Sequence, residues 1–88
     1  MNPITLPLPV WTWDGSEWTA PIGTSIRLVV RPDTRGRLVW RWDVQTVHDG
    51  GGSIVCHRSS SATRHERTAE AAQLAAWDAL AKWLGATA

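Results

Sequence analysis

The chain has 88 residues, a length that fits one domain and leaves no room for a second. Hydrophobic residues make up 43% and charged residues 19%, so the chain is apolar enough to fold and too varied for a disordered tail or a fibrous repeat. The net charge of +1 argues against strong non-specific binding to nucleic acid. The aromatic set is seven tryptophans without Phe or Tyr, so tryptophan must supply both bulky core volume and any aromatic binding surface.

A single cysteine, Cys56, excludes an intrachain disulfide and favours a reducing, cytoplasmic compartment. Pro3, Pro7 and Pro9 interrupt the apolar N-terminus, which also lacks the basic segment of a signal peptide. The apolar runs fall far short of the roughly 18 residues that a membrane-spanning helix needs. The sequence therefore predicts a cytoplasmic protein without a transmembrane helix.

The first two thirds of the chain carry strand signals. Residues 1–9 alternate proline with apolar residues and favour an extended arm. Beyond the arm, residues 10–60 predict an antiparallel sheet, because period-two alternation rich in Ile, Val and Trp recurs between turn residues. The expected segments are a hairpin over 10–19 that turns at Asp14-Gly15, strands over 24–31 and 37–48 joined by 32–36, a turn over 48–52 and a strand over 53–59.

After residue 60 the composition changes to alanine and leucine and predicts one helix over 68–84, which Gly85 ends. Thr63 heads a capping-box pattern and Thr68 is also a good N-cap; we favour Thr68. The apolar stripe expected to cover the sheet is Leu74, Trp77, Leu80, Ala81 and Leu84. The apolar arc continues on a flank of the helix made of Ala69, Ala72, Ala76, Ala79 and Trp83. We expect the N-terminal arm or the hairpin to cover this flank; the alternative is contact with a second copy of the chain or with a partner.

These elements predict an α+β fold in a single domain over residues 1–88. It has an antiparallel sheet of three to five strands, with one C-terminal helix packed on one face.

Charge is distributed unevenly along the chain. Residues 27–67 carry eight arginines against four carboxylates, while the segments on either side are slightly acidic. If the turn at 32–36 sets Val30 opposite Leu38, Arg27 lies opposite Arg41 and Arg31 opposite Arg37. The other face is then the apolar core, made of Ile26, Leu28, Val30, Trp40, Trp42, Val44, Ile54 and Cys56.

Like charges directly opposite each other are unfavourable in a sheet. The two arginine pairs, with His57 on the same face, therefore suggest a surface that binds an anionic partner, unless Asp43 and Glu17 screen them. Arginines on an exposed strand face are also ordinary solubilising charge, so both interpretations stay open.

No catalytic or metal-binding pattern stands out. The spacing of the candidate ligands matches neither zinc modules nor a helical His pair; they are His48, Asp49, Cys56, His57 and His65. Gly50-Gly51-Gly52 lacks the lysine and the helix of a phosphate-binding loop. We predict no enzyme activity, no cofactor and no metal site.

Three strands followed by a helix that begins Thr68-Ala69-Glu70-Ala71-Ala72 and continues to Ala76-Trp77-Asp78 resemble the plant AP2 domain and the arm-binding domains of phage integrases. The resemblance implies that the exposed sheet face enters the DNA major groove and that Arg27, Arg31, Arg37 and Arg41 contact DNA. In its small size and lack of catalytic residues the chain also looks like accessory proteins of phages and mobile elements, including anti-CRISPR inhibitors.

The leading hypothesis is a small non-catalytic binding module, a phage or mobile-element accessory or inhibitor protein. It would engage a host protein or nucleoprotein complex through the arginine-rich face. The expected partner-binding residues are Arg27, Arg31, Arg37, Arg41, His57 and Trp83. One alternative is direct DNA binding through the same face. Another is a structural homodimer formed through the helix.

Overall fold

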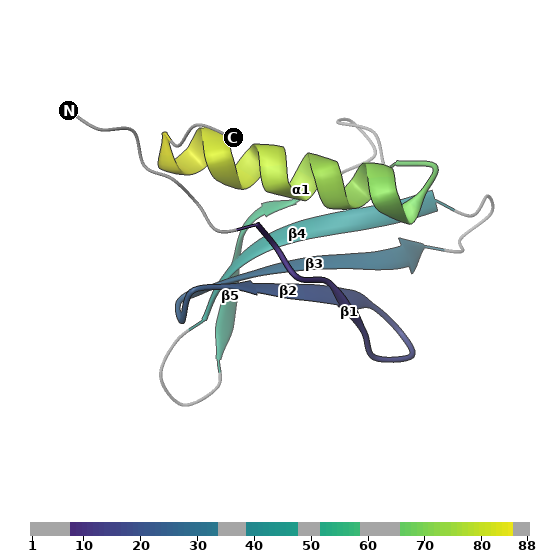
Figure 1. Cartoon of the computed structure of the whole chain (residues 1–88), viewed down its shortest axis with the longest axis horizontal. Coiled ribbons are helices and arrows are strands. Elements are labelled where there is room, and N and C mark those ends of the chain that lie inside the picture. Colours follow the sequence, from purple (N-terminus) through teal and green to yellow (C-terminus); the bar gives the residue numbers. More distant parts are fainter. Residues whose placement is uncertain (1–7, 34–38, 48–51, 59–65, 86–88) are drawn as a thin grey trace.

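The computed structural model describes residues 8–33, 39–47, 52–58 and 66–85 (Figure 1). They form five strands and one helix: β1 Thr12–Trp13, β2 Trp18–Ile22, β3 Ile26–Asp33, β4 Val39–Val47, β5 Ser53–Arg58 and α1 Ala69–Leu84. The α+β class, with an antiparallel sheet and one C-terminal helix packed on it, is confirmed.

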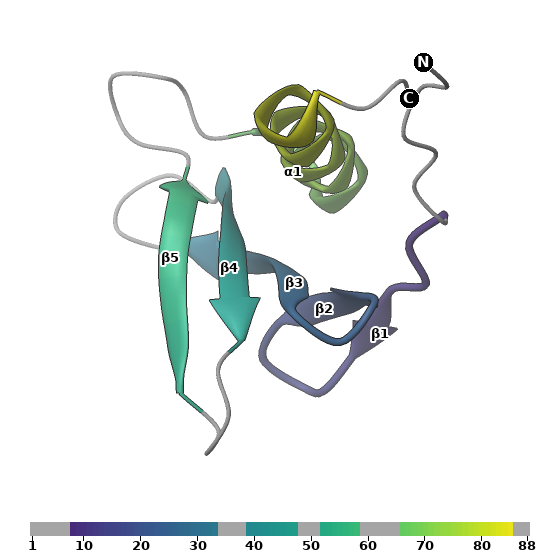
Figure 2. The same cartoon turned by 90° about the vertical axis from the view of Figure 1, so that its left-hand side faces the viewer.

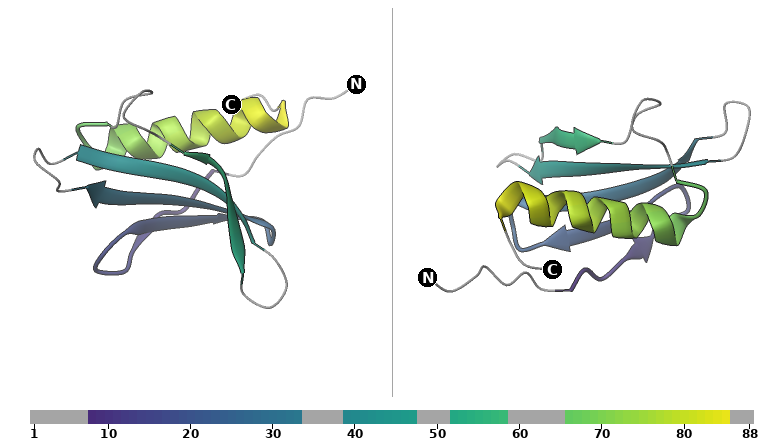
Figure 3. Two further views of the ribbon diagram at one scale, coloured as in Figure 1. Left: turned by 180° about the vertical axis from the view of Figure 1, so that it is seen from behind. Right: turned by 90° about the horizontal axis from the view of Figure 1, so that it is seen from above.

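The sheet is a meander, because its spatial order β1-β2-β3-β4-β5 is also the chain order and all neighbours are antiparallel. The helix lies along the strands on one face (Figure 3). Seen end-on, the sheet curves so that its strands partly surround the helix, and no described element covers the opposite face (Figure 2).

The β1–β2 hairpin turns where the sequence predicts, at Asp14-Gly15, where Gly15 has a φ of 101°. Asp14 Oδ1 accepts hydrogen bonds from the backbone N–H groups of Ser16 and Glu17, at 2.8 and 2.9 Å. These bonds, first that of Ser16 and then that of Glu17, favour the ionised form and hold the pKa of Asp14 below its usual value. The turn sets Trp13 directly opposite Trp18.

The register between β3 and β4 differs from the predicted one by four residues. Arg27 lies opposite Gln45, and Arg31 lies opposite Arg41, so the expected Arg27–Arg41 and Arg31–Arg37 pairs are wrong. The observed register reduces two predicted like-charge pairs to one, which is more favourable in a sheet. Because the shift is an even number of residues, the predicted assignment of β3 and β4 side chains to the two faces is retained.

The core is small and lies between the centre of the sheet and the helix. Its fully or almost fully buried members are Ala20, Ile22, Leu28, Val44, Ala76 and Leu80. Tryptophans pack around this cluster and are only partly buried: Trp11, Trp42 and Trp77. Bulky indoles therefore line the border of the core, while small and medium-sized side chains fill its centre.

The helix is turned relative to the predicted orientation. Ala72 and Ala76, predicted to lie on the flank, are fully buried, whereas Leu74 of the predicted stripe is 69% exposed. Leu80 and Ala81 are buried, as predicted. Alanine at the centre permits a close approach of helix and sheet, and the sheet itself covers the alanine flank. Ala72 and Ala76, at the centre of the flank, are therefore not accessible for the homodimer contact considered as an alternative.

The helix begins and ends as its sequence predicts. Thr68 caps it, because its Oγ1 accepts a hydrogen bond from the Ala71 N–H at 3.1 Å. Gly85 ends it in the left-handed conformation with a φ of 66°. Just before the cap, Glu66 forms two backbone hydrogen bonds with Trp40, of 2.7 and 3.0 Å, which tie the start of the helix to β4.

Candidate functional site

The arginines of the exposed sheet face are hydrogen-bonded or paired within the sheet. Arg31 lies between two carboxylates, with Nη2 3.2 Å from Asp43 Oδ2 and Nε 3.7 Å from Glu17 Oε2. Arg41 Nη1 lies 3.9 Å from Asp33 Oδ2. Two more hydrogen bonds run from the guanidinium of Arg27 to Gln45 Oε1, at 2.6 and 3.2 Å. The carboxylate screening that the sequence left open is therefore present.

These arginines also cover the sheet. Val29, Asp43 and Gln45 lie on the face away from the helix and are buried, although no described element packs there. Arg27 and Arg31 are the neighbours of Val29 on the same face of β3. We infer that their aliphatic stems lie over the strand while their charged ends reach the carboxylates and the amide.

Of the three other predicted partner-binding residues, the structure describes the side chain of Trp83 alone. Arg37 lies outside the described residues. A β-bulge falls between Val44 and Gln45, and beyond it His57 pairs with Val44 on β4, while Arg58 pairs with Asp43. The bulge interrupts the simple alternation that grouped His57 with the arginines, and the position of the His57 side chain stays a prediction. Trp83 is exposed in the last turn of α1, on the other side of the sheet.

We expect loss of the Arg31–Asp43 ion pair in the sheet to destabilise the fold more than loss of the exposed Lys82–Asp78 ion pair on the helix. Arg31→Ala leaves Asp43, whose side chain is only 11% exposed, without its ion pair and should lower the free energy of unfolding by about 1–2 kcal/mol. Lys82→Ala breaks a pair of similar length, 3.0 Å, but with Asp78 60% exposed, and should cost under about 0.5 kcal/mol. Urea denaturation measures both, and equally small losses would show that the sheet pair adds little stability.

Three tryptophans meet at the surface, beside the first turn of the helix. The ring centroids of Trp13 and Trp18 are 5.4 Å apart at 50°, and those of Trp13 and Trp40 are 6.4 Å apart at 66°. With residues 67–70 they line a hollow of about 500 Å³, which we call the tryptophan recess. Trp13 is 42% exposed, and the other two rings are half-buried.

Each wall of the recess has an identifiable cause in the fold. The turn at Asp14 places Trp13 opposite Trp18, and the Trp40–Glu66 backbone pair brings the helix start to the same end of the sheet. Sequence reasoning placed Trp40 in the core and therefore missed the recess. Trp13 and Trp18 on either side of a turn were the available signal, but the contact with Trp40 depends on pairing between distant segments.

A second hollow, of about 390 Å³, adjoins the recess along the helix. Its lining residues are Leu8, Pro9, Trp11, Glu70, Gln73, Leu74 and Trp77. Glu70 borders both hollows. Leu8 and Leu74, both well exposed, make this side of the molecule apolar.

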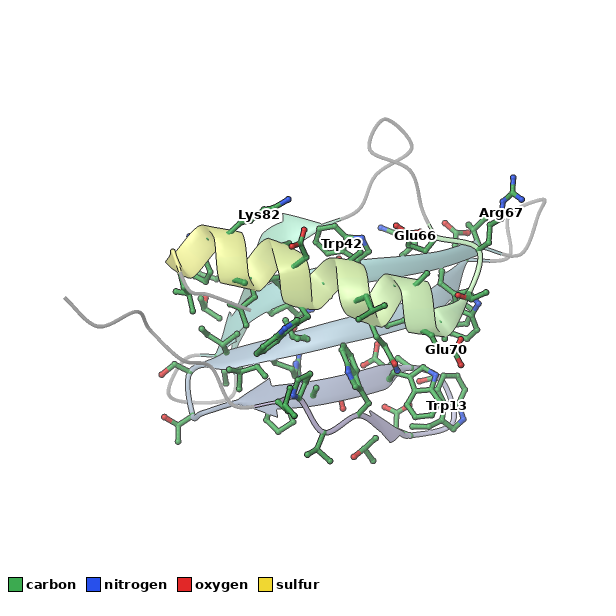
Figure 4. The ribbon with its side chains drawn as sticks, turned by 45° about the horizontal axis from the view of Figure 1, so that its top comes forward. Trp13, Trp42, Glu66, Arg67, Glu70 and Lys82 are labelled. Atoms are coloured by element: carbon green, nitrogen blue, oxygen red, sulfur yellow. The ribbon has the colours of Figure 1, made fainter. Side chains whose placement is uncertain are left out.

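Two charged residues border the recess. Arg67 points outward from the helix start, away from Trp13, whereas Glu70 lies beside Trp13 (Figure 4). Both are exposed, and within the described residues neither makes an ion pair or a side-chain hydrogen bond. The recess thus presents aromatic rings with one adjacent free carboxylate.

No family model, curated protein or solved structure matches this chain. The resemblance to AP2 and integrase arm-binding domains therefore stays a prediction. Within the ranges that the structure describes, no group of His, Cys, Asp and Glu is arranged to hold a metal ion. In the same ranges, no helix combines the length and apolarity needed to cross a membrane.

Proposed function

We propose that this protein is a non-catalytic binding module that docks a partner protein on the tryptophan recess and the adjoining hollow. The observation that carries the proposal is the cluster of three indole rings at the surface, outside the buried core. Tryptophan offers a large, rigid contact area and is enriched among the residues that dominate binding energy at protein interfaces. Contiguous exposed apolar surface of this kind marks interaction sites.

The class of function is the one expected from the sequence, but the proposed surface is different. A partner or a DNA phosphate that binds Arg31 or Arg41 has to compete with carboxylates already placed within 4 Å of them. That competition lowers the gain from each new contact. The recess needs no such exchange, because 42% of Trp13 is already exposed and the described lining residues make no ion pair that a partner would have to break.

The test is a selection from a displayed random-peptide library with the whole chain as bait, followed by affinity measurements on the enriched peptides. Trp13→Ala should weaken their binding at least about tenfold, as expected for an interface tryptophan that contributes over 1.4 kcal/mol. Trp83→Ala is the matched control, since both rings are 42% exposed and Trp83 lies in the last helical turn. Circular dichroism checks that both variants fold.

Enriched peptides that bind wild type and Trp13→Ala equally would refute the recess as the docking site, and so would a selection that enriches nothing. Loss of binding in Trp83→Ala alone would place the site at the other end of the helix. Affinity measurements with duplex DNA in place of the peptides test the DNA-binding alternative. If the protein binds DNA through the arginines, its affinity for DNA should fall steeply with added salt.

A further inference from the structure

We infer that the tryptophan recess receives a basic side chain, lysine or arginine, of the partner protein, held against the faces of Trp13 and Trp40 and by the carboxylate of Glu70. The inference rests on the proposed function and adds the chemistry of the group that the recess selects.

All three indoles line the recess. At interplanar angles of 50° and 66°, neither pair stacks face to face, and we expect part of the ring faces to be accessible from the recess. The face of an aromatic ring carries partial negative charge and attracts a cation within about 6 Å of its centre, and tryptophan does so most strongly. Trp13 belongs to both pairs and is the most exposed ring, so we expect it to make the main contact.

The charges around the recess favour a cation. Glu70 borders the recess without an ion-pair partner among the described residues, and Arg67 is directed away from the rings. An anion would meet ring faces of the wrong sign; of the N–H groups at the helix start, which favour anions, that of Ala71 is already bonded to Thr68.

The lining suits a lysine or arginine side chain along its whole length. Its aliphatic stem can contact the indoles while its charged end stays near the carboxylate and the solvent. An apolar side chain gains the first contact but not the second. Discrimination between a charged and a neutral side chain of similar length is therefore the property to measure.

The experiment uses two probes, N-acetyl-lysine methylamide and its norleucine analogue, which has a similar chain without the charge. Titrations follow the indole N–H signals of Trp13, Trp18 and Trp40 by NMR in the full chain. We expect saturable shifts with the lysine probe, in the millimolar range of dissociation constants, and at least about threefold weaker binding of norleucine. Sodium chloride at the same ionic strength should cause no such shifts.

Glu70→Gln should weaken lysine binding about three- to fivefold and leave norleucine binding unchanged. Asp78→Asn is the matched control, because this carboxylate is on the same helix, does not line the recess and is paired with Lys82. Equal binding of the two probes, or equal effects of Glu70→Gln on both, would overturn the inference and leave an apolar docking site. Absence of shifts with either probe would also overturn it, whereas the proposed function stands or falls on the peptide selection.

Discussion

Replacing Leu80 with alanine should lower the free energy of unfolding by about 2–5 kcal/mol, a large part of the stability of a domain this small. Leu80 is fully buried in the core cluster, where it packs with Leu28 and Val44. Its truncation removes apolar contacts and leaves a cavity that the surrounding structure closes only in part. Urea denaturation followed by circular dichroism measures the loss.

Leu74→Ala is the matched control, since it makes the same chemical change on the same helix. Leu74 is mostly exposed, so the loss should stay within about 0.5 kcal/mol. Equal losses at the two positions would mean that the helix packs with the stripe predicted from its sequence, and would contradict the observed orientation.

Enlarging Ala76 to leucine should destabilise the protein by about 1–3 kcal/mol. Ala76 is fully buried where the helix approaches the sheet, and it meets core residues such as Ala20 and Val44. Three additional carbon atoms must either push the helix from the sheet or adopt a strained rotamer. A lower midpoint of thermal or urea unfolding is the expected readout.

Ala75→Leu provides the comparison, because Ala75 is only half-buried and lies outside the core cluster. The larger side chain has room there, and we expect a change below about 0.5 kcal/mol. If Ala76→Leu left the free energy of unfolding unchanged, helix and sheet would not be closely packed at this point. That result would agree with the alternative in which the alanine flank is free to form a dimer contact.

Local signals in the sequence predicted the elements of the fold well. Asp14-Gly15, Thr68 and Gly85 act through turn and cap chemistry within a few residues, so their effect can be read without the tertiary structure. The register could not be read in this way. Proline usually ends a strand, yet β3 continues through Pro32, which pairs with Trp40, and this extension shifts the register by four residues.

The helix orientation and the site were missed for related reasons. An amphipathic pattern ranks leucine above alanine, but the separation of helix and sheet decides which of them fits between the two layers, as Leu74 and Ala76 illustrate. The tryptophan recess depends on the backbone pairing of Trp40 with Glu66, between segments far apart in the chain. No local sequence pattern predicts the pairing of these two segments.

The order of the strands has a consequence for how the chain folds. Every strand pairs with its neighbour in the chain, so each hairpin closes only a short loop, and the entropic cost of closure stays low at each step. The helix that covers the apolar face follows all five strands. During synthesis on the ribosome, a nascent sheet must therefore expose Leu28 and Val44 until residues 69–84 emerge, and that interval is when a chaperone would have most to bind.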